Sequence, residues 1–204
     1  MLRYPFGYLL WYPRILRGTR LKAGAPGYVH INSLEMIVVS IQLAAVMQAL
    51  QHYPQETLCG MLSGIIPAEP ILLAWCDNTS ATAWAHKATS KSLQGQNLVK
   101  ILAEMLLLTN VGLSCTYISS KSNDLADFIS RHTSKPIQHV AHCEQIYQKA
   151  AHMRNWRFFL PSPELSQLLS SALFSAPWAA RPSLPKSLGQ FVPDASTTSC
   201  SPIL

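Results

Sequence analysis

Three acidic residues stand where a fold is able to bring their side chains together. Asp77 directly follows the apolar run 71–76, Glu35 lies in the first turn of an expected helix, and Asp127 follows the strand-like run 113–118. An acid at the carboxyl end of a buried strand sits where α/β folds expose ligand-binding groups. Carboxylates from separate elements suit two Mg²⁺ ions about 3.5–4 Å apart, which together activate a water and stabilise a leaving oxygen. The pattern points to magnesium-dependent phosphodiester chemistry.

Taken singly, each acid has a plainer explanation. An acid early in a helix is more often a cap or a partner of the helix dipole, and this applies to Glu35 and to Asp124. Asp124 would replace Asp127 as a ligand if the register of the helix around them is off by one turn. An unrelated α/β domain whose acids only cap helices therefore remains an alternative.

Composition favours one medium-sized domain with a tail. The chain has 204 residues, 49% of them hydrophobic, which is enough to bury a real core. With 16 basic and 10 acidic residues the net charge is +6, which makes a polyanionic partner such as nucleic acid plausible, although a merely basic soluble domain explains the charge equally well.

The cysteines and the apolar runs bear on the compartment. The five cysteines are odd in number and scattered, and several stand in apolar runs where a reduced thiol packs as a small hydrophobe. A reducing compartment, cytoplasm or nucleus, is therefore expected. No membrane span is expected, because Glu104 interrupts the best apolar run and Gln42 the next. Pro13 and Arg14 leave no signal-peptide core at the amino terminus.

Periodicity and turn residues predict an α/β layered domain. The expected strands cover 27–32, 71–76 and 113–118, the second of them as a buried strand. The expected helices cover 33–50, capped by Ser33 or Asn32, then 79–87, capped by Asp77 or Asn78, and 92–109, 123–131, 139–156 and 161–173. Alternating strands and helices indicate a layered α/β fold.

The two ends of the chain differ in character from this central part. Residues 1–26 are aromatic, basic and rich in proline, and we expect an irregular lead-in. Residues 27–131 would form the domain, and residues 132–176 a helical extension. Residues 177–204 carry five prolines and many serines, which predicts a disordered linker.

Three segments resemble the ribonuclease H domain that follows the reverse transcriptase in retroelements. They are Ile31-Asn32-Ser33-Leu34-Glu35, similar to the family's helix-borne glutamate motif; Asp77-Asn78-Thr79-Ser80-Ala81, similar to its strand-end aspartate; and Asn123-Asp124-Leu125-Ala126-Asp127-Phe128-Ile129-Ser130-Arg131, similar to the signature near its end. The third is the most specific, because its spacing matches as well as its residue types. The closest likeness is to the gypsy and DIRS-like retrotransposons.

The resemblance implies a fold and an activity. The fold would be a ribonuclease H-like mixed sheet flanked by helices. The intact domain would hydrolyse the RNA strand of an RNA–DNA hybrid with two Mg²⁺ ions, held by Glu35, Asp77 and Asp127, or by Asp124 in place of Asp127. The implied partners are the hybrid or another nucleic acid and an upstream reverse transcriptase domain of the same polyprotein.

One feature of the family pattern is missing. The family's first catalytic aspartate lies on an opening β-hairpin, whereas this chain has no aspartate before Asp77, and residues 1–28 are too short and too rich in proline to supply the hairpin. We therefore expect a chain truncated at its amino terminus, poorly stable alone and with little or no nuclease activity. The competing hypothesis is a catalytically dead remnant that binds nucleic acid or a protein neighbour.

Two further groups of residues are weaker candidates. The histidines and the cysteine between His132 and His152 match no paired zinc-ligand spacing, so a polar helix face is preferred. Lys87, Lys91 and Lys100 could meet the phosphate backbone of a hybrid, but solvated lysines are the preferred explanation.

Overall fold

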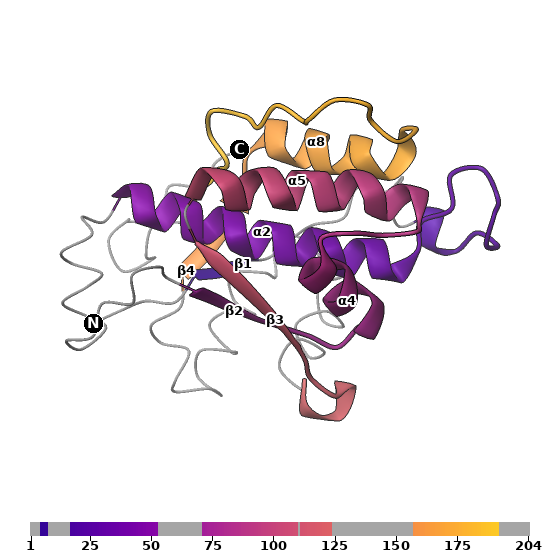
Figure 1. The fold of residues 1–204 in the computed structure, drawn as a ribbon, viewed down its shortest axis with the longest axis horizontal. Coiled ribbons are helices and arrows are strands. Elements are labelled where there is room, and N and C mark those ends of the chain that lie inside the picture. The colour runs from indigo at the N-terminus through magenta and orange to yellow at the C-terminus, as the bar shows by residue number, and fades with distance from the viewer. Residues whose placement is uncertain (1–4, 8–16, 53–70, 110, 124–156, 192–204) are drawn as a thin grey trace, which may run out of the picture.

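The computed structural model describes residues 5–7, 17–52, 71–109, 111–123 and 157–191, which form a mixed α/β structure (Figure 1). Its elements are β1 (Pro5–Gly7), α2 (Ile31–His52), β2 (Ile71–Cys76), α4 (Thr79–Lys87), α5 (Leu93–Thr109), β3 (Gly112–Tyr117), the 3-10 turn η1 (Ser120–Ser122), β4 (Arg157–Pro161), α8 (Pro163–Phe174) and β5 (Gly189–Phe191).

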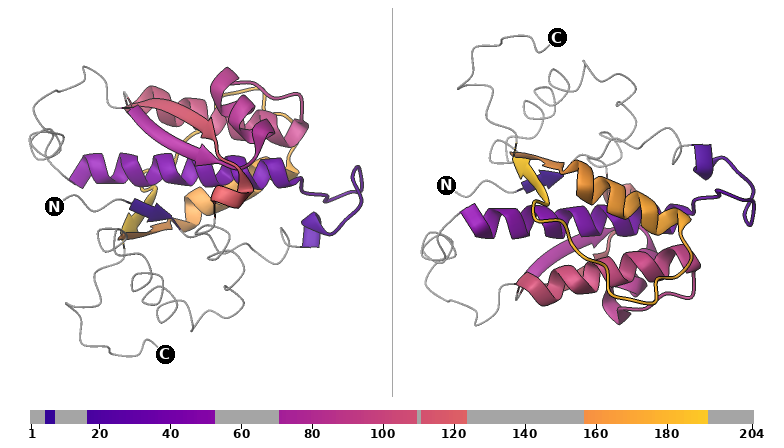
Figure 2. Two further views of the ribbon diagram at one scale, coloured as in Figure 1. Left: turned by 90° about the horizontal axis from the view of Figure 1, so that it is seen from below. Right: turned by 90° about the horizontal axis from the view of Figure 1, so that it is seen from above.

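The strands form two small sheets on either side of α2. Strands β2 and β3 pair in parallel, with Ala74 opposite Cys115. The other sheet has the order β1-β4-β5, in which β1 runs parallel and β5 antiparallel to β4. Figure 2 shows α2 between the two sheets, and α2 contacts strands of both. The helix that carries Glu35 is therefore fixed from two sides.

Helix α2 is apolar around most of its circumference, as expected of a helix buried on several faces. Among the described residues, α2 is the one helix that is long and apolar enough to cross a membrane. The expectation, based on Glu104 and Gln42, that no segment has this length and composition is therefore wrong. The polar residues of α2 are too few to offset its many apolar residues. However, 61% of this stretch is buried inside the structure, as in the core helix of a soluble protein, so it is weak evidence for a membrane span.

The start of α2 differs from the prediction. Residues 27–32 form no strand, and the helix begins at Ile31, where Nδ1 of His30 accepts a hydrogen bond from the backbone N–H of Asn32 at 3.1 Å. Neither Asn32 nor Ser33 is the cap: Ser33 is buried and donates to Oε1 of Gln94 at 3.2 Å. Gln94 on α5 also accepts from the backbone N–H of His30, so a tertiary contact fixes the helix start. As a result, no acid lies in the first turn, and Glu35 lies one turn further on.

Several other elements match the prediction closely. Strand β2 has the predicted bounds, α4 matches the predicted 79–87, and α5, β3 and α8 differ from prediction by one or two residues. Of the two predicted caps of α4, Asn78 is the one observed, with Oδ1 accepting from the backbone N–H of Ala81 at 3.0 Å. The predicted helix 123–131, apart from its first residue, and the predicted helix 139–156 lie outside the described residues.

The apolar sequence of β2 predicted a strand buried on both faces. The structure buries only one of them. Ile71, Leu73 and Trp75 are 63%, 66% and 69% exposed, whereas the alternating residues Ala74 and Cys76 are buried. Among the described elements, α2 and α4 pack on this small sheet. An apolar run cannot reveal how many of its faces are covered.

The described part of the carboxyl-terminal region packs against the rest of the chain. Phe159 of β4, Leu169 of α8 and Leu188 belong to the same buried apolar cluster as Val29 and Met36, so the core does not end at residue 131. The expected disordered linker is wrong for residues 177–191, which contain β5 and run along α5. In the expected lead-in, residues 5–7 form β1 by pairing with β4.

A buried amide holds this segment in place. Asn97 of α5 is fully buried; its Oδ1 accepts from the backbone N–H of Trp178 at 2.8 Å, and its Nδ2 donates to the carbonyls of Ala176 at 3.0 Å and Ser175 at 3.5 Å. Lys100 donates to the carbonyl of Trp178. These contacts hold the proline-rich stretch that precedes β5 against α5, although this stretch forms no helix or strand.

Replacing Asn97 by alanine is expected to destabilise the chain by about 2 kcal/mol, because the buried amide of Asn97 supplies three hydrogen bonds to the backbone of this segment. The free energy of unfolding from urea denaturation measures this. Gln96→Ala on the same helix is the control and should change the stability little. A loss no greater for Asn97→Ala than for Gln96→Ala would contradict the assignment.

Candidate metal centre

The ends of α2, β2 and α4 meet at one point. Strand β2 ends at Cys76, so Asp77 stands at its carboxyl end, before the cap residue of α4. That cap residue, Asn78, donates from Nδ2 to Oδ1 of Asn32 at 2.7 Å, which ties the start of α4 to the first turn of α2. This contact brings the second turn of α2, with Glu35, towards the end of β2.

Glu35, Cys76 and Asp77 form a compact group there. Each offers one potential ligand atom, and these three atoms all lie within 4.8 Å of one another. Sγ of Cys76 lies 4.0 Å from Oε2 of Glu35. Cys76 is buried, and both acids are half-buried. The structure thus brings together Glu35 and Asp77, two of the three acids singled out in the sequence.

The third sequence motif starts beside the same group. Asn123, its first residue, donates from Nδ2 to Oδ2 of Asp77 at 3.3 Å. Asn123 is held there because the chain continues from β3 through η1, and the backbone N–H of Ile118 donates to the carbonyl of Cys76 at 3.0 Å. Asp124 and Asp127 lie outside the described residues, so their distance from Asp77 is not part of the observed geometry.

The environment disfavours negative charge on Glu35. Its pKa is raised, first by burial and second by the negative charge of Asp77. Burial also raises the pKa of the Cys76 thiol to about 11, with Glu35 adding to the effect, and burial raises the pKa of Cys115. Without a cation, negative charge on Glu35 and on the Cys76 thiol is therefore unfavourable.

The donor set fits a divalent cation, but not one class of cation alone. The two carboxylates are the hard oxygen ligands that Mg²⁺ prefers, while waters complete its shell. A thiol is a poor ligand for Mg²⁺ and a good one for softer metals. The sequence analysis did not include Cys76 among the possible metal ligands, because it treated the cysteines as small hydrophobes. The position of Cys76 next to Asp77, at the end of a strand, could have indicated this role.

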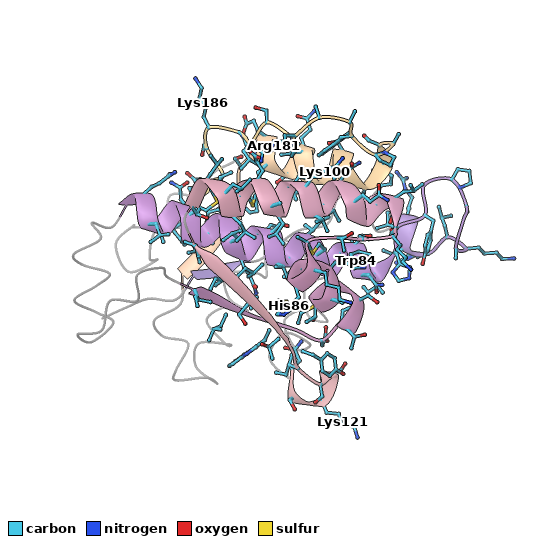
Figure 3. The ribbon with its side chains drawn as sticks, in the orientation of Figure 1. Trp84, His86, Lys100, Lys121, Arg181 and Lys186 are labelled. Carbon is cyan, nitrogen blue, oxygen red and sulfur yellow. The ribbon has the colours of Figure 1, made fainter. Side chains whose placement is uncertain are left out.

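Lys100, one of the three lysines considered as phosphate contacts, is engaged away from this group. Lys100 is bonded to the carbonyl of Trp178, and Figure 3 shows it with Arg181 on the side of α5 that faces the carboxyl-terminal segment. Lys121 instead projects from η1 on the opposite side of the molecule. Lys121 stands two residues before Asn123, the residue that donates to Asp77. The residues 132–152 with the clustered histidines lie outside the described part.

The raised pKa of Glu35 predicts a pH effect on stability. The folded chain holds a proton that the unfolded chain releases near the ordinary pKa of 4.5, so stability falls as pH rises through the folded pKa of Glu35 and stays lower above it. Glu35→Gln should therefore make the cation-free protein modestly more stable at neutral pH and remove this part of the pH dependence.

Urea denaturation between acidic and neutral pH, with a chelator present, measures this effect. Glu164→Gln, at an exposed position on α8, is the control for loss of a carboxylate. A Glu35→Gln protein that is less stable than the wild type at neutral pH without cations would contradict the assigned repulsion.

Comparison of the chain with known protein families, with curated proteins and with solved structures finds no match.

Proposed function

We propose that the chain is part of a retroelement polyprotein and carries the divalent-cation site of a ribonuclease H-like domain, which in its intact form hydrolyses the RNA strand of RNA–DNA hybrids. The observation that carries the proposal is the convergence of Glu35 and Asp77. These residues belong to two separate sequence motifs, one at the start of α2 and one at the end of β2, and the fold brings them together. Parallel pairing of β2 with β3 and the position of α2 against them are consistent with such a sheet.

The proposed roles follow from the contacts. Glu35 and Asp77 would hold the cation, and Asn123 would orient Asp77 by its hydrogen bond to Oδ2. The bond between Asn78 and Asn32 would keep the two acids at a fixed separation. A further ligand would come from Asp127 or Asp124. Two Mg²⁺ ions, when bound, would supply Lewis-acid activation of water and neutralisation of developing charge.

The test is binding of an end-labelled RNA–DNA hybrid, measured by fluorescence anisotropy with and without Mg²⁺. We expect Mg²⁺ to tighten hybrid binding relative to a DNA duplex of the same sequence, because the hybrid would be recognised by shape and 2′-hydroxyls, and Asp77→Asn to abolish this gain. Equal binding of hybrid and duplex, unaffected by Mg²⁺ or by Asp77→Asn, would contradict the proposal.

Cleavage by the chain alone is expected to be slow or undetectable, because no aspartate precedes Asp77 to complete the family's set of acids. The RNA strand of the same labelled hybrid, resolved on a denaturing gel, measures this. Clear Mg²⁺-dependent cleavage that is lost in Asp77→Asn would refute the expected inactivity while supporting the nuclease site.

A second function is favoured by a different observation. The exposed row of Ile71, Leu73 and Trp75 on β2 is an apolar surface of the kind that contacts a partner. The alternative is therefore a catalytically dead module that binds nucleic acid or a protein neighbour. Hybrid binding that needs Trp75 but is indifferent to Mg²⁺ and to Asp77 would favour this alternative.

A further inference from the structure

Cys76 belongs to the group with Glu35 and Asp77, but a magnesium site has no need of its thiol. Its side chain is 4% exposed, so it is well protected from solvent. Sγ lies 4.0 Å from Oε2 of Glu35 and 3.6 Å from the carbonyl oxygen of Asn78. The thiol is therefore directed towards the carboxylates from the end of the strand, while Glu35 approaches from α2.

The neighbouring thiol shows that this placement is specific. Cys115 lies on the adjacent strand opposite Ala74, two residues before Cys76 in β2, and is also buried. Yet Cys115 is not part of the group that lies within 4.8 Å. The two cysteines therefore share a sheet, a burial class and a side-chain type, but only Cys76 faces both acids.

The two carboxylates and the thiol of this group differ in the metal ions they prefer. Carboxylates bind hard and borderline cations alike, whereas a thiolate adds affinity for Zn²⁺ and similar ions and adds little for Mg²⁺. When such an ion binds, the S–H bond of Cys76 breaks, a sulfur–metal bond forms, and the proton passes to solvent. No oxidant or reductant is needed.

We propose that Glu35, Cys76 and Asp77 form a mixed oxygen–sulfur site that binds a thiophilic divalent cation, represented by Zn²⁺, in competition with Mg²⁺. The competition rests on the proposed function, because it requires that Mg²⁺ uses the same two carboxylates. Zn²⁺ would then act as an inhibitor of the centre: it would occupy Glu35 and Asp77 and engage the sulfur, which Mg²⁺ leaves free.

Co²⁺ absorption tests the proposal, since Co²⁺ substitutes for Zn²⁺ and gives a near-ultraviolet charge-transfer band only when a thiolate is bound. Wild type, Cys76→Ser and Cys115→Ser are titrated with Co²⁺, and the difference from wild type is the readout because the chain has other thiols. We expect Cys76→Ser to lose band intensity and about tenfold or more in Co²⁺ affinity. Cys115→Ser should resemble the wild type.

Displacement of Mn²⁺, followed by its electron paramagnetic resonance signal, separates the two proposals. We expect Cys76→Ser to bind Mn²⁺ within about twofold of the wild type, since manganese prefers oxygen ligands, but to require more Zn²⁺ for its release. A Cys76-dependent Co²⁺ band without Mn²⁺ binding would uphold the thiophilic site and remove the support for Mg²⁺. Mn²⁺ binding with a band unchanged by Cys76→Ser would overturn the mixed site and leave the nuclease proposal standing.

A folding defect in Cys76→Ser is controlled for by a second variant. Glu35→Gln keeps the thiol and removes one carboxylate, so it should weaken Co²⁺ binding and reduce the Cys76-dependent band. If Glu35→Gln leaves both the band and the Co²⁺ affinity at wild-type values, the three residues do not form one site.

Discussion

Asp77→Asn is expected to weaken Mn²⁺ binding by at least about tenfold, which corresponds to ~1.4 kcal/mol of binding free energy. The substitution keeps the size of the side chain and its ability to accept from Nδ2 of Asn123, but it removes the negative charge that a cation needs. Among the described residues only Glu35 then remains as a carboxylate in the group. Isothermal titration with Mn²⁺ measures the change.

The control for Asp77→Asn is Glu164→Gln. Glu164 is an exposed acid in the first turn of α8, so its replacement makes the same change in net charge away from the group. Its Mn²⁺ affinity should equal that of the wild type. If Asp77 instead serves only as a structural residue, Asp77→Asn would change the unfolding free energy and leave Mn²⁺ binding as it was.

Phe159→Ala is expected to cost about 3–5 kcal/mol of unfolding free energy, the usual range for removing a buried aromatic ring. Phe159 is fully buried, and its ring lies 5.4 Å from that of Phe191, centroid to centroid, at an interplanar angle of 61°. The ring also lies directly against Gly189, where an added Cβ would be 2.5 Å from its Cζ. Since domains have only about 5–15 kcal/mol in total, much of the chain should unfold in the variant.

Leu160→Ala is the matched control for Phe159→Ala. Leu160 is the next residue of β4, points to the other face and is 45% exposed, so its truncation should cost little. Thermal and urea denaturation, followed by circular dichroism, compare the two. If Phe159→Ala melts residues 157–191 in a separate early transition while the remaining helices stay folded, the single core described above is wrong.

The elements around the candidate site were predictable because local signals agreed with the fold. The short apolar run 71–76, bounded by turn residues, became β2, and Asn78 became the cap that its residue type favours. The same local logic placed Asp77 at a strand end. The contact between Glu35 and Asp77 is long-range in sequence, and only the order of the motifs predicted it.

The start of α2 was predicted wrongly because a tertiary contact overrides local preference. Tyr28 to Asn32 contains β-branched and aromatic residues and therefore indicates a strand, yet Gln94 from α5 bonds to His30, Ser33 and the carbonyl of Tyr28. No pattern within a short window contains that information. The shift moved Glu35 from the helix terminus into the second turn, where capping no longer explains it.

The carboxyl-terminal segment and Cys76 were missed for different reasons. Proline and serine content indicates that residues 177–191 cannot form a regular core element, but it says nothing about a buried amide such as Asn97 that supplies their hydrogen bonds from elsewhere. Cys76 was overlooked because a buried cysteine usually packs in the core as a small apolar side chain. Only its distance from Glu35 and Asp77 gives it another role.

The enclosure of α2 has a consequence for biosynthesis. One side of this helix is covered by β2, whereas the other is covered by β4 and β5, which a ribosome makes more than 100 residues after α2 ends at His52. Until residue 191 has been made, the nascent helix exposes a long apolar side, and exposed apolar surface of this kind favours self-association. Pairing of Pro5–Gly7 with Arg157–Phe159 closes a loop that spans most of the chain, so folding is expected to be slow and to finish only after residue 191 has been made.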